Sequence, residues 1–473
     1  MSAHSPQPEM PVRASQILRV RKIWLLPAVI AAVFVTLLAF VYLGAVVNPT
    51  GHLHGLPVMV VNEDQGASVH GQDVRIGASV VKGLEQSHGV ASRLDLRNAT
   101  LSHAKATMDR GGAYATVVIP ATLSESVLAA TGADGASAGV PAKASIELLE
   151  NSRLGSLGVN LAAGVLTPAI EKISRRIGSN VSSLATPAAV SNPLVVADLA
   201  DPVALTTSSY RPLPDHSALG LSAFYIALLS IMVGFISSTL INSSIDSALG
   251  YGATELGPHW RHRRPVAINR RQTLLVKWGA ALLVTPVVTV ILLLVAVGAL
   301  HMYAPHLVLL WLLAALAALM IATGTLSLLS IFGSIGQLLA MILLVYLSLA
   351  SSGGTVPIQA LPGFFNVVGH VEPLRQVLDG TRAIMYFGAR GDAGLTHSVV
   401  VLACELAFWM IVGLAVTSWY DHKKLYRLAP DVFASVERAI DQRLRERAAG
   451  IAAATPTDQM AEKASPSEGG PGP

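Results

Sequence analysis

One acidic residue stands well inside an apolar stretch of the chain. Glu405 is the only Asp, Glu, Lys or Arg in the run from Thr396 to Trp419. Because a carboxylate is costly inside a membrane, such a residue is a functional candidate that could carry protons or bind a cationic substrate. The alternative is a structural hydrogen bond or ion pair within a helix bundle, with Arg375 or Arg382 as the partner.

Sequence motifs of enzymes are either absent from this chain or lack the surrounding residues that they require. Residues 135–139 match the pattern GxSxG, but they lie in an Ala- and Gly-rich stretch without the strand and helix that a nucleophile elbow requires. His52 and His54 have no evident third ligand for a metal site. No GxxxxGK followed by Ser or Thr occurs, so the chain has no phosphate-binding loop of its own. We therefore expect neither an enzyme nor a cofactor bound by this chain.

Composition indicates an integral membrane protein. The 473 residues are 52% hydrophobic and only 13% charged, whereas soluble proteins carry about 25% charged residues. The single cysteine, Cys404, leaves no disulfide within the chain. Aromatic residues do not interleave with Lys and Arg as single-strand binders require, so we expect contact with membrane lipids and not with nucleic acid.

Six apolar runs are long enough to cross a bilayer, which takes about 20 residues. The first is too long for the apolar core of a signal peptide, and it follows Arg19, Arg21 and Lys22. Positive residues in short loops stay on the cytoplasmic side. We therefore expect a multi-pass protein of a bacterial plasma membrane with cytoplasmic N- and C-termini. The runs are Ile23–Val47, Leu219–Asn242, Gly279–Met302, Leu307–Phe332, Leu338 to about Pro357, and Thr396–Trp419.

The polar stretch 48–217 predicts a small domain outside the cell. Strands are expected at 56–61, 114–119 and 144–150, alternating with helices as in α/β domains. The expected fold is a mostly α-helical polytopic membrane protein, with six transmembrane helices and a small extracytoplasmic α/β domain inserted between spans 1 and 2. Its parts are a cytoplasmic tail (1–22), span 1 (23–47), the outer domain (48–217), spans 2–6 (218–420), and a cytoplasmic helix with a disordered tail (421–473).

Two charged segments interrupt spans 2–6. The cytoplasmic loop 243–278 either anchors the topology or docks a cytoplasmic partner. It holds six positive side chains: Arg261, Arg263, Arg264, Arg270, Arg271 and Lys277. The outer segment 357–392 is apolar but is broken by Pro357, Pro362 and Pro373, so it does not span. Irregular backbone at membrane depth must be enclosed by protein or line a cavity, and we expect one or two re-entrant helices.

A final helix is expected from Pro430 onward. Phe433, Val436, Ile440 and Leu444 form one apolar stripe, and charged residues cover the rest of its surface. Such a helix could lie on the membrane or bind a partner. It could equally pack on the chain's own cytoplasmic loop.

Three segments together resemble the ABC-2 type exporter permeases, in the phage-infection-protein-like branch that is related to nitrosoguanidine-resistance-like membrane proteins. The first segment, Leu56–Gly66 (LPVMVVNEDQG), opens the outer domain. The second is Gly112–Pro120 (GAYATVVIP), and the third is Glu372–Arg382 (EPLRQVLDGTR) before the last span. The outer domain is much shorter than in the large phage-receptor and secretion relatives, which argues against those roles.

The resemblance implies a permease subunit that pairs as a homodimer or with a similar permease. A separate ATPase would supply energy from ATP, and the cargo would be amphipathic or lipid-like. The segment that contacts the ATPase would comprise Glu255, His259, Trp260, Arg261, Arg263, Arg264, Arg270 and Arg271. The outer gate would comprise Glu372, Pro373, Arg375, Asp379 and Arg382. Two alternatives stay open: a proton-coupled multidrug exporter that uses Glu405, and a non-transporting envelope scaffold or receptor.

Overall fold

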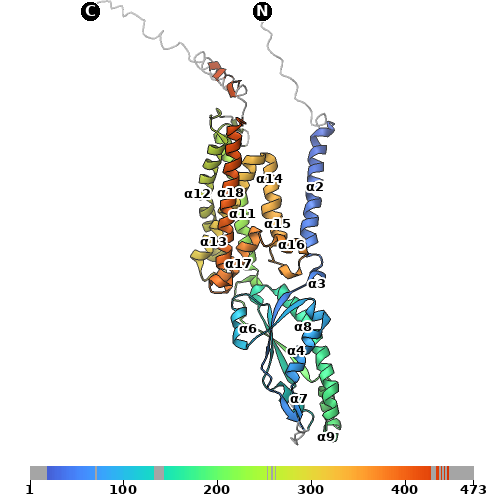
Figure 1. The fold of residues 1–473 in the computed structure, drawn as a ribbon. Coiled ribbons are helices and arrows are strands. Elements are labelled where there is room, and N and C mark those ends of the chain that lie inside the picture. Colours follow the sequence, from blue (N-terminus) through green and yellow to red (C-terminus); the bar gives the residue numbers. More distant parts are fainter. Residues whose placement is uncertain are drawn as a thin grey trace, which may run out of the picture.

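A helical part and an α/β part follow one another along one long axis of the molecule (Figure 1). The computed structural model describes residues 19–69, 72–132, 143–252, 254–256, 259–261 and 263–427, and beyond them 433–435, 438, 441–442 and 445–446. The GxSxG match and Val436, Ile440 and Leu444 of the expected final helix lie outside the described residues.

Six helices are long and apolar enough to cross a membrane, which confirms the predicted polytopic fold. They are α2 (Arg21–Val46), α11 (Ser222–Ala248), α12 (Arg270–Leu293) with its π-helical extension η4 (Leu294–Ala299), α13 (Leu307–Phe332), a composite fifth helix, and α18 (Leu395–His422). The fifth consists of α14 (Ser334–Ala340), η5 (Met341–Tyr346) and α15 (Leu347–Ser351). The start of α2 and the end of α18 lie at the same end of the molecule, opposite the α/β part (Figure 1).

Helix α13 is the centre of the bundle and packs against α11, α12 and α18. Small residues bring these helices close together, as is usual between membrane helices. A Cβ at Gly234 of α11 would lie 2.4 Å from the Ala318 carbonyl oxygen of α13. Trp311 of α13 donates its indole N–H to the Pro286 carbonyl of α12 at 3.1 Å. The backbones of α11 and α13 are thus in direct contact.

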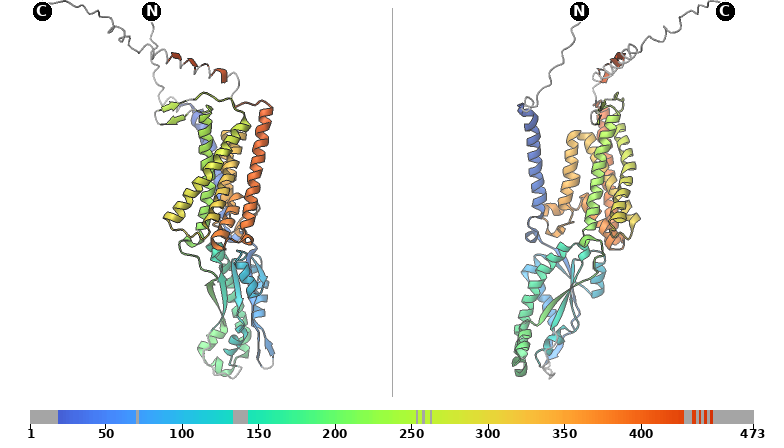
Figure 2. Two further views of the ribbon diagram at one scale, coloured as in Figure 1. Left: turned by 90° about the vertical axis from the view of Figure 1, so that its left-hand side faces the viewer. Right: turned by 180° about the vertical axis from the view of Figure 1, so that it is seen from behind.

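Helix α2 stands apart from this bundle, with α14 and α15 between them (Figure 2). Its contacts include a ring pair between Phe34 and Tyr346, with centroids 6.1 Å apart. Most of its other apolar side chains are exposed, as Phe40 is at 75%. Such a surface is suited to lipid tails or to another membrane helix.

Several spans differ from their predicted bounds, and α11, for example, runs to Ala248, beyond Asn242. For two of them the structure shows the local cause. The third begins at Arg270, well before Gly279, because Asn269 Oδ1 accepts the Gln272 N–H at 2.8 Å and so caps the helix. The fifth begins at Ser334 and ends at Ser351. It ends there because Gly353 has a positive φ of 71°, and because Gly354 packs so closely on Phe224 that a Cβ would lie 2.1 Å from its ring. Hydropathy alone does not reveal either terminus.

The α/β domain is built on a five-stranded sheet of order β4-β1-β5-β6-β7. The strands are β1 (Leu56–Asn62), β4 (Leu94–Asn98), β5 (Ala115–Ile119), β6 (Ala144–Glu150) and β7 (Val203–Ser209). All neighbours are parallel except β5 and β6, with Val117 opposite Leu148. A separate hairpin joins β2 (Ala67–Val69) to β3 (Gln72–Val74). The predicted domain omitted β4 and β7, which are the edge strands, because edge strands carry a weaker apolar pattern.

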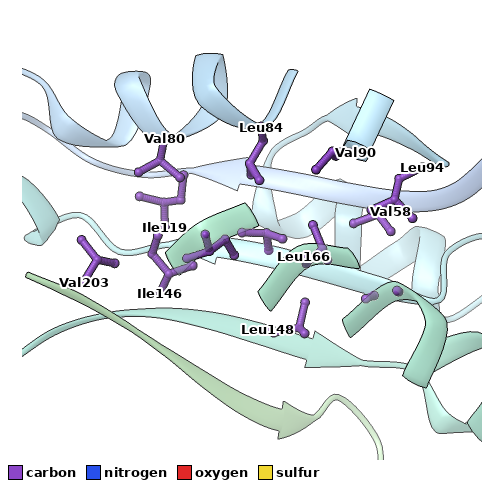
Figure 3. Packing of buried hydrophobic residues seen from close by; sticks show 14 of the residues in the cluster. Val58, Val80, Leu84, Val90, Leu94, Ile119, Ile146, Leu148, Leu166 and Val203 are labelled. Carbon is purple, nitrogen blue, oxygen red and sulfur yellow. The ribbon is translucent and has the colours of Figure 1, made fainter. Parts of the chain in front are cut away.

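Helices cover both faces of this sheet (Figure 1). One face packs on α4 (Ile76–Gln86), α7 (Leu123–Ala129) and α8 (Ser156–Val181), and Figure 3 shows Val80, Leu84 and Leu166 against the strand residues Ile119, Ile146 and Leu148. The other face packs on α6 (Leu101–Met108). Val58 faces the first core and Met59 the second, as the alternation of a strand requires.

Short elements complete the description. They are α3 (Pro49–His52), α5 (His88–Ala91), η1 (Ser152–Leu154), η2 (Ser182–Leu184), α9 (Pro187–Val190), α10 (Pro193–Ala200) and η3 (Ala218–Gly220) in or beside the α/β domain. In the second half, β8 (Thr254–Leu256) pairs with β9 (His259–Arg261), and η6 (Ile358–Ala360), α16 (Gly363–Val368), α17 (Pro373–Tyr386) and η7 (Gly391–Ala393) lie between the last two spans.

Asp64, in the turn after β1, ties two helix N-termini together. Its carboxylate accepts the Gly77 N–H (2.9 Å) of α4, and the Ser124 N–H (2.9 Å) and hydroxyl (2.7 Å) of α7. Ser124 Oγ in turn accepts the Ile76 N–H at 2.8 Å. A carboxylate suits helix N-termini, where backbone N–H groups lack partners inside the helix. The NEDQG segment therefore has a structural role in this domain.

We expect Asp64→Asn to destabilise the α/β domain by about 1–3 kcal/mol, because the amide loses the charge and one acceptor of this network. The measurement is the rate of limited proteolysis of the purified chain across a temperature series. Asp73→Asn, on an exposed residue of β3 with no ion pair among the described residues, is the matched control. Equal cleavage of the two variants would contradict the assignment.

We expect Gly234→Val to destabilise the helix bundle by about 1–3 kcal/mol, because the added atoms must separate α11 from α13. Thermal unfolding of the detergent-solubilised chain measures the effect. Gly279→Val in α12 is the control, since a Cβ there meets nothing within 4 Å. The close packing of α11 on α13 is not needed if both variants unfold at the same temperature.

Candidate functional site

Helix α17 occupies the junction between the bundle and the α/β domain (Figure 1). It begins with Pro373 in its first turn, where the missing N–H costs nothing. Its sides pack against α11, α13 and α18, and nearly all of its residues are buried. It is an amphipathic helix of 14 residues, too short to cross a bilayer, so it has the character of the expected re-entrant segment.

Hydroxyl groups of neighbouring spans fasten α17 in place. The Leu374 N–H donates to Ser348 Oγ of α15 at 2.8 Å, and Ser398 Oγ of α18 donates to the Gln376 carbonyl at 2.6 Å. A Cβ at Gly380 would lie 2.4 Å from Ser398 Oγ. These bonds satisfy backbone groups that are buried in the protein, as buried N–H and C=O groups require.

The predicted gate residues are all on α17 or at its start. Arg375 and Asp379 form a loose ion pair of 3.7 Å. Arg382 is only 7% exposed, and its Nε has no hydrogen-bond partner in the described part of the protein. Glu372 is also 7% exposed, with Oε2 unpartnered there. The structure thus brings one acidic and two basic side chains to one helix, with Glu372 set apart at its N-terminus.

A cavity of about 330 Å³ separates α17 from the α/β domain. Arg110 and Tyr114 line it from the domain, and Arg375, Asp379 and Arg382 line it from α17. The segment before α16 contributes Gln359, whose Oε1 has no donor among the described residues. We call this space the junction cavity. Three polar atoms without a protein partner therefore belong to its lining: Arg382 Nε, Arg375 Nη1 and Gln359 Oε1.

Tyr114 is the aromatic wall of the junction cavity. Gly158 of α8 leaves room for its ring, since a Cβ there would lie 2.2 Å from Tyr114 Cε1. Burial raises the pKa of the Tyr114 phenol, and the nearby Arg382 guanidinium acts in the opposite direction. The phenol is therefore neutral at physiological pH and is suited to donating a hydrogen bond.

Arg153 joins the α/β domain to the other end of α17. Its Nη1 donates to the Tyr386 carbonyl at 2.8 Å, and its Nη2 donates to the Pro212 carbonyl at 3.3 Å. Burial lowers the pKa of Arg153, but an arginine stays charged in proteins. A second cavity of about 460 Å³ opens beside it, lined by Arg211, Tyr303 and Arg390 among others. Arg153 therefore links the end of α17 to the α/β domain.

Glu405 lies on α18 and is half-buried. Its Oε1 has no hydrogen-bond partner in the part of the protein that the structure describes. No ion pair joins it to Arg375 or Arg382 there, because Arg375 instead faces Asp379. The alternative of an ion pair with one of these arginines therefore has no support among the described residues.

A buried ion network holds the other end of the bundle. Asp246 of α11 accepts Lys277 Nζ of α12 at 2.8 Å, and it accepts both terminal nitrogens of Arg427, after α18, at 2.7 and 2.9 Å. Lys277 Nζ also donates to Asn242 Oδ1 at 2.7 Å. The side chain of Lys277 is only 3% exposed. Removal of one partner from such a network leaves a buried charge, which is strongly destabilising.

Asp421 at the end of α18 strengthens this anchor. Its two carboxylate oxygens accept the N–H groups of Arg270 (2.9 Å) and Arg271 (3.0 Å), at the N-terminus of α12. Arg270 in turn donates to the Leu425 carbonyl at 2.7 Å and lies over the Tyr420 ring. Carboxylates near a helix N-terminus are favourable. The ends of α11, α12 and α18 therefore form one connected unit.

The predicted ATPase contact divides into two groups. Glu255, His259, Trp260 and Arg261 belong to the β8–β9 hairpin, which is described by its backbone pairing alone. Arg270 contacts α18, and Arg264 forms an ion pair with Asp441. Arg263 and Arg271 are exposed, and no ion pair engages either within the described residues. These two are the arginines of the set that present free charge.

Reasoning from the sequence missed the residues that connect elements. Arg110 and Arg153 carry no sequence signal because each lies among polar residues, and Tyr114 reads only as the first residue of a strand. Asp246 and Lys277 did carry a signal: opposite charges stand near facing ends of two consecutive apolar runs, and such charges tend to pair. Among the described residues, no group of three His, Cys, Asp or Glu could hold a metal ion, so His52 and His54 gain no third ligand there.

Individual proteins match only part of this chain, whereas a family model matches most of its length. The uncharacterized protein YhgE of Bacillus subtilis (strain 168) is 34% identical over 85 residues, which are 18% of this chain and 10% of that protein. The chain thus matches about a tenth of that relative's length. A crystal structure described as a domain of a "putative ABC type-2 transporter" from Thermotoga maritima MSB8 covers 36% of this chain and 97% of its own, with 19% identity and a TM-score of 0.23.

A family model matches far more of the chain than either relative does. It spans residues 28–412, from the first apolar helix through the α/β domain to the last one. The match therefore covers both parts of the molecule and the junction between them. Because it includes more than half of the sequence, the chain belongs to the family described as "Protein of unknown function (DUF3533)".

Proposed function

We propose that this chain is a permease subunit of an ABC-2 type exporter, in which a separate ATPase drives the export of an amphipathic or lipid-like compound. The observation that carries the proposal is the continuous mechanical path between the two ends of the bundle. At one end, Asp246, Lys277 and Arg427 lock α11, α12 and the segment after α18 together. At the other end, α11 and α18 hold α17 under the α/β domain.

This path is what an externally driven permease needs. The chain has no phosphate-binding loop of its own, so force would come from a partner that pushes on the segment between α11 and α12. That segment enters α12 directly at Arg270 and Arg271, whose N–H groups Asp421 binds. Long helices transmit such a push as rigid rods. A tilt of α11 and α18 would then shift α17 and open a path at the outer end.

The orientation of the molecule in the membrane follows from the same proposal. The basic segment 259–271 would face the cytoplasm, by the positive-inside rule, and the start of α2 and the end of α18 lie on that side in the fold. The α/β domain would then lie outside the plasma membrane. A second permease copy or a similar permease would complete the transporter, with the exposed surface of α2 available for contact.

We expect the double variant Arg263→Ala/Arg271→Ala to lower recovery of a co-purifying ATPase by about fivefold, since each exposed ion pair contributes about 0.2–1 kcal/mol. The measurement is affinity purification of the tagged chain from its native membrane, with quantitative mass spectrometry of the ATPase. Lys423→Ala/Lys424→Ala is the matched control, because it removes equal charge after α18 from exposed residues. Equal recovery with all three proteins would contradict docking at Arg263 and Arg271.

A proton-coupled exporter is a second candidate, and one observation favours it. Among the described residues, Glu405 of α18 and Glu372 at the start of α17 each have a buried carboxylate oxygen without a hydrogen-bond partner. Two carboxylates in a low-dielectric region can share and release a proton. The candidate needs no ATPase, which separates it from the first.

We expect Glu405→Gln to leave export within about twofold of the original chain, because an ATPase-driven permease needs no titrating group in its spans. The test is uptake of the exported compound into inverted membrane vesicles. It is measured with ATP present and with the proton gradient collapsed by an uncoupler. The proton-coupled mechanism replaces the first if the uncoupler stops transport while ATP stays high and the glutamine variant is equally inactive.

A further inference from the structure

The two cavities beside α17 carry an excess of positive charge that ion pairs only partly balance. Their linings together include six arginines and three aspartates. Each aspartate has a different arginine partner: Asp109 pairs with Arg211 at 3.0 Å, Asp392 with Arg390 at 2.9 Å, and Asp379 with Arg375 at 3.7 Å. Among the described residues, the other three arginines have no carboxylate within 4 Å, and they are Arg110, Arg153 and Arg382.

The three remaining arginines differ in what else satisfies them. Arg153 donates to the carbonyl oxygens of Tyr386 and Pro212, so its role is structural. Arg110 and Arg382 form no hydrogen bond or ion pair through their side chains among the described residues, and both line the junction cavity. They approach it from opposite sides, since Arg110 follows α6 in the α/β domain and Arg382 belongs to α17.

The burial of Arg382 is the strongest element of this arrangement. Arg382 as a residue is only 7% exposed, and its Nε is buried without a partner among the described residues. A buried charge without a partner is costly. Asp379 is its neighbour on α17, but it is shared with Arg375. The fork of an arginine matches the oxygens of a phosphate or carboxylate, and such charge-assisted bonds are strong.

The remaining lining indicates what else the ligand carries. Gln359 Oε1 needs a donor, which a hydroxyl group of the ligand would supply. Tyr114 adds an aromatic wall and a phenol. At about 330 Å³, the cavity is at the lower end of the range for small-molecule sites, so it suits a headgroup and not a whole lipid.

We propose that the junction cavity binds a phosphorylated, hydroxyl-bearing headgroup, with Arg382 and Arg110 gripping the phosphate from α17 and from the α/β domain. Phosphatidylglycerol in the outer leaflet and a free glycerol phosphate share this chemistry. That the bound compound is cargo rests on the export function proposed above, whereas the binding itself requires no ATPase.

The test is isothermal titration of the full purified chain in neutral detergent micelles. The probes are dihexanoyl phosphatidylglycerol, dihexanoyl phosphatidylcholine, glycerol 3-phosphate and inorganic phosphate. The original chain is expected to bind phosphatidylglycerol more tightly than phosphatidylcholine. Arg382→Gln and Arg110→Gln are each expected to weaken that binding about tenfold, which is the loss of one charge-assisted hydrogen-bond contact. Arg97→Gln, on an exposed arginine paired with Asp95, should leave it unchanged.

Two results of the titration would overturn the proposal. Equal affinity for the two lipids overturns the proposal, as does binding by both cavity variants at the strength of the original chain. If Arg382→Gln does not fold, Arg110→Gln decides alone, because Arg110 is only partly buried. Glycerol 3-phosphate binding as tightly as the lipid identifies a free phosphate ester as the source of the headgroup. Binding without any co-purifying ATPase sustains the site and removes only its cargo role.

Discussion

The enclosure of α17 is the constraint on which the rest of the structure depends. A charged 14-residue helix cannot rest among membrane spans unless protein satisfies its ends and its side chains. Ser348 and Ser398 bind its backbone, Gly380 lets α18 approach, and Arg153 holds its far end from the α/β domain. The spans must leave room for this helix, and the α/β domain must cover it. The two halves of the molecule are therefore parts of one assembly.

The two ends of the bundle use charge in different ways. At the end that we place in the cytoplasm, Lys277 and Arg427 both bind Asp246, and the N-terminus of α12 binds Asp421. Each of these carboxylates therefore has partners on two segments, which connects the helix ends. At the α17 end, polar atoms in the lining of the junction cavity have no protein partner among the described residues. A connected end suits the transfer of force, and an end with unpartnered polar groups suits the binding of a ligand.

The lengths of the apolar runs predicted the six spans, because a helix needs about 20 apolar residues to cross a bilayer. The alternation of expected strands and helices predicted the α/β class of the outer domain. Details that depend on tertiary contacts could not be predicted. Strands β4 and β7 lie at the edges of the sheet, where each strand pairs with one neighbour and not with two. Their apolar pattern in the sequence is correspondingly weak. Arg270 reads as a loop charge, yet α12 starts there with Asn269 as its cap, and Asp421, far away in sequence, binds the first two N–H groups of the helix. Arg110 and Arg382 meet at one cavity only through the fold.

Whether an arginine has an ion-pair partner within the chain distinguishes a structural role from a role in binding a ligand. Arg427 is bidentate with Asp246, and Arg390 is bidentate with Asp392, so each has a complete explanation within the chain. Arg382 has no ion pair within 4 Å and no side-chain hydrogen bond among the described residues, although it is only 7% exposed. A buried guanidinium with so few partners is costly for folding. The cost is offset once an anion enters, and that ties the charge of α17 to a ligand.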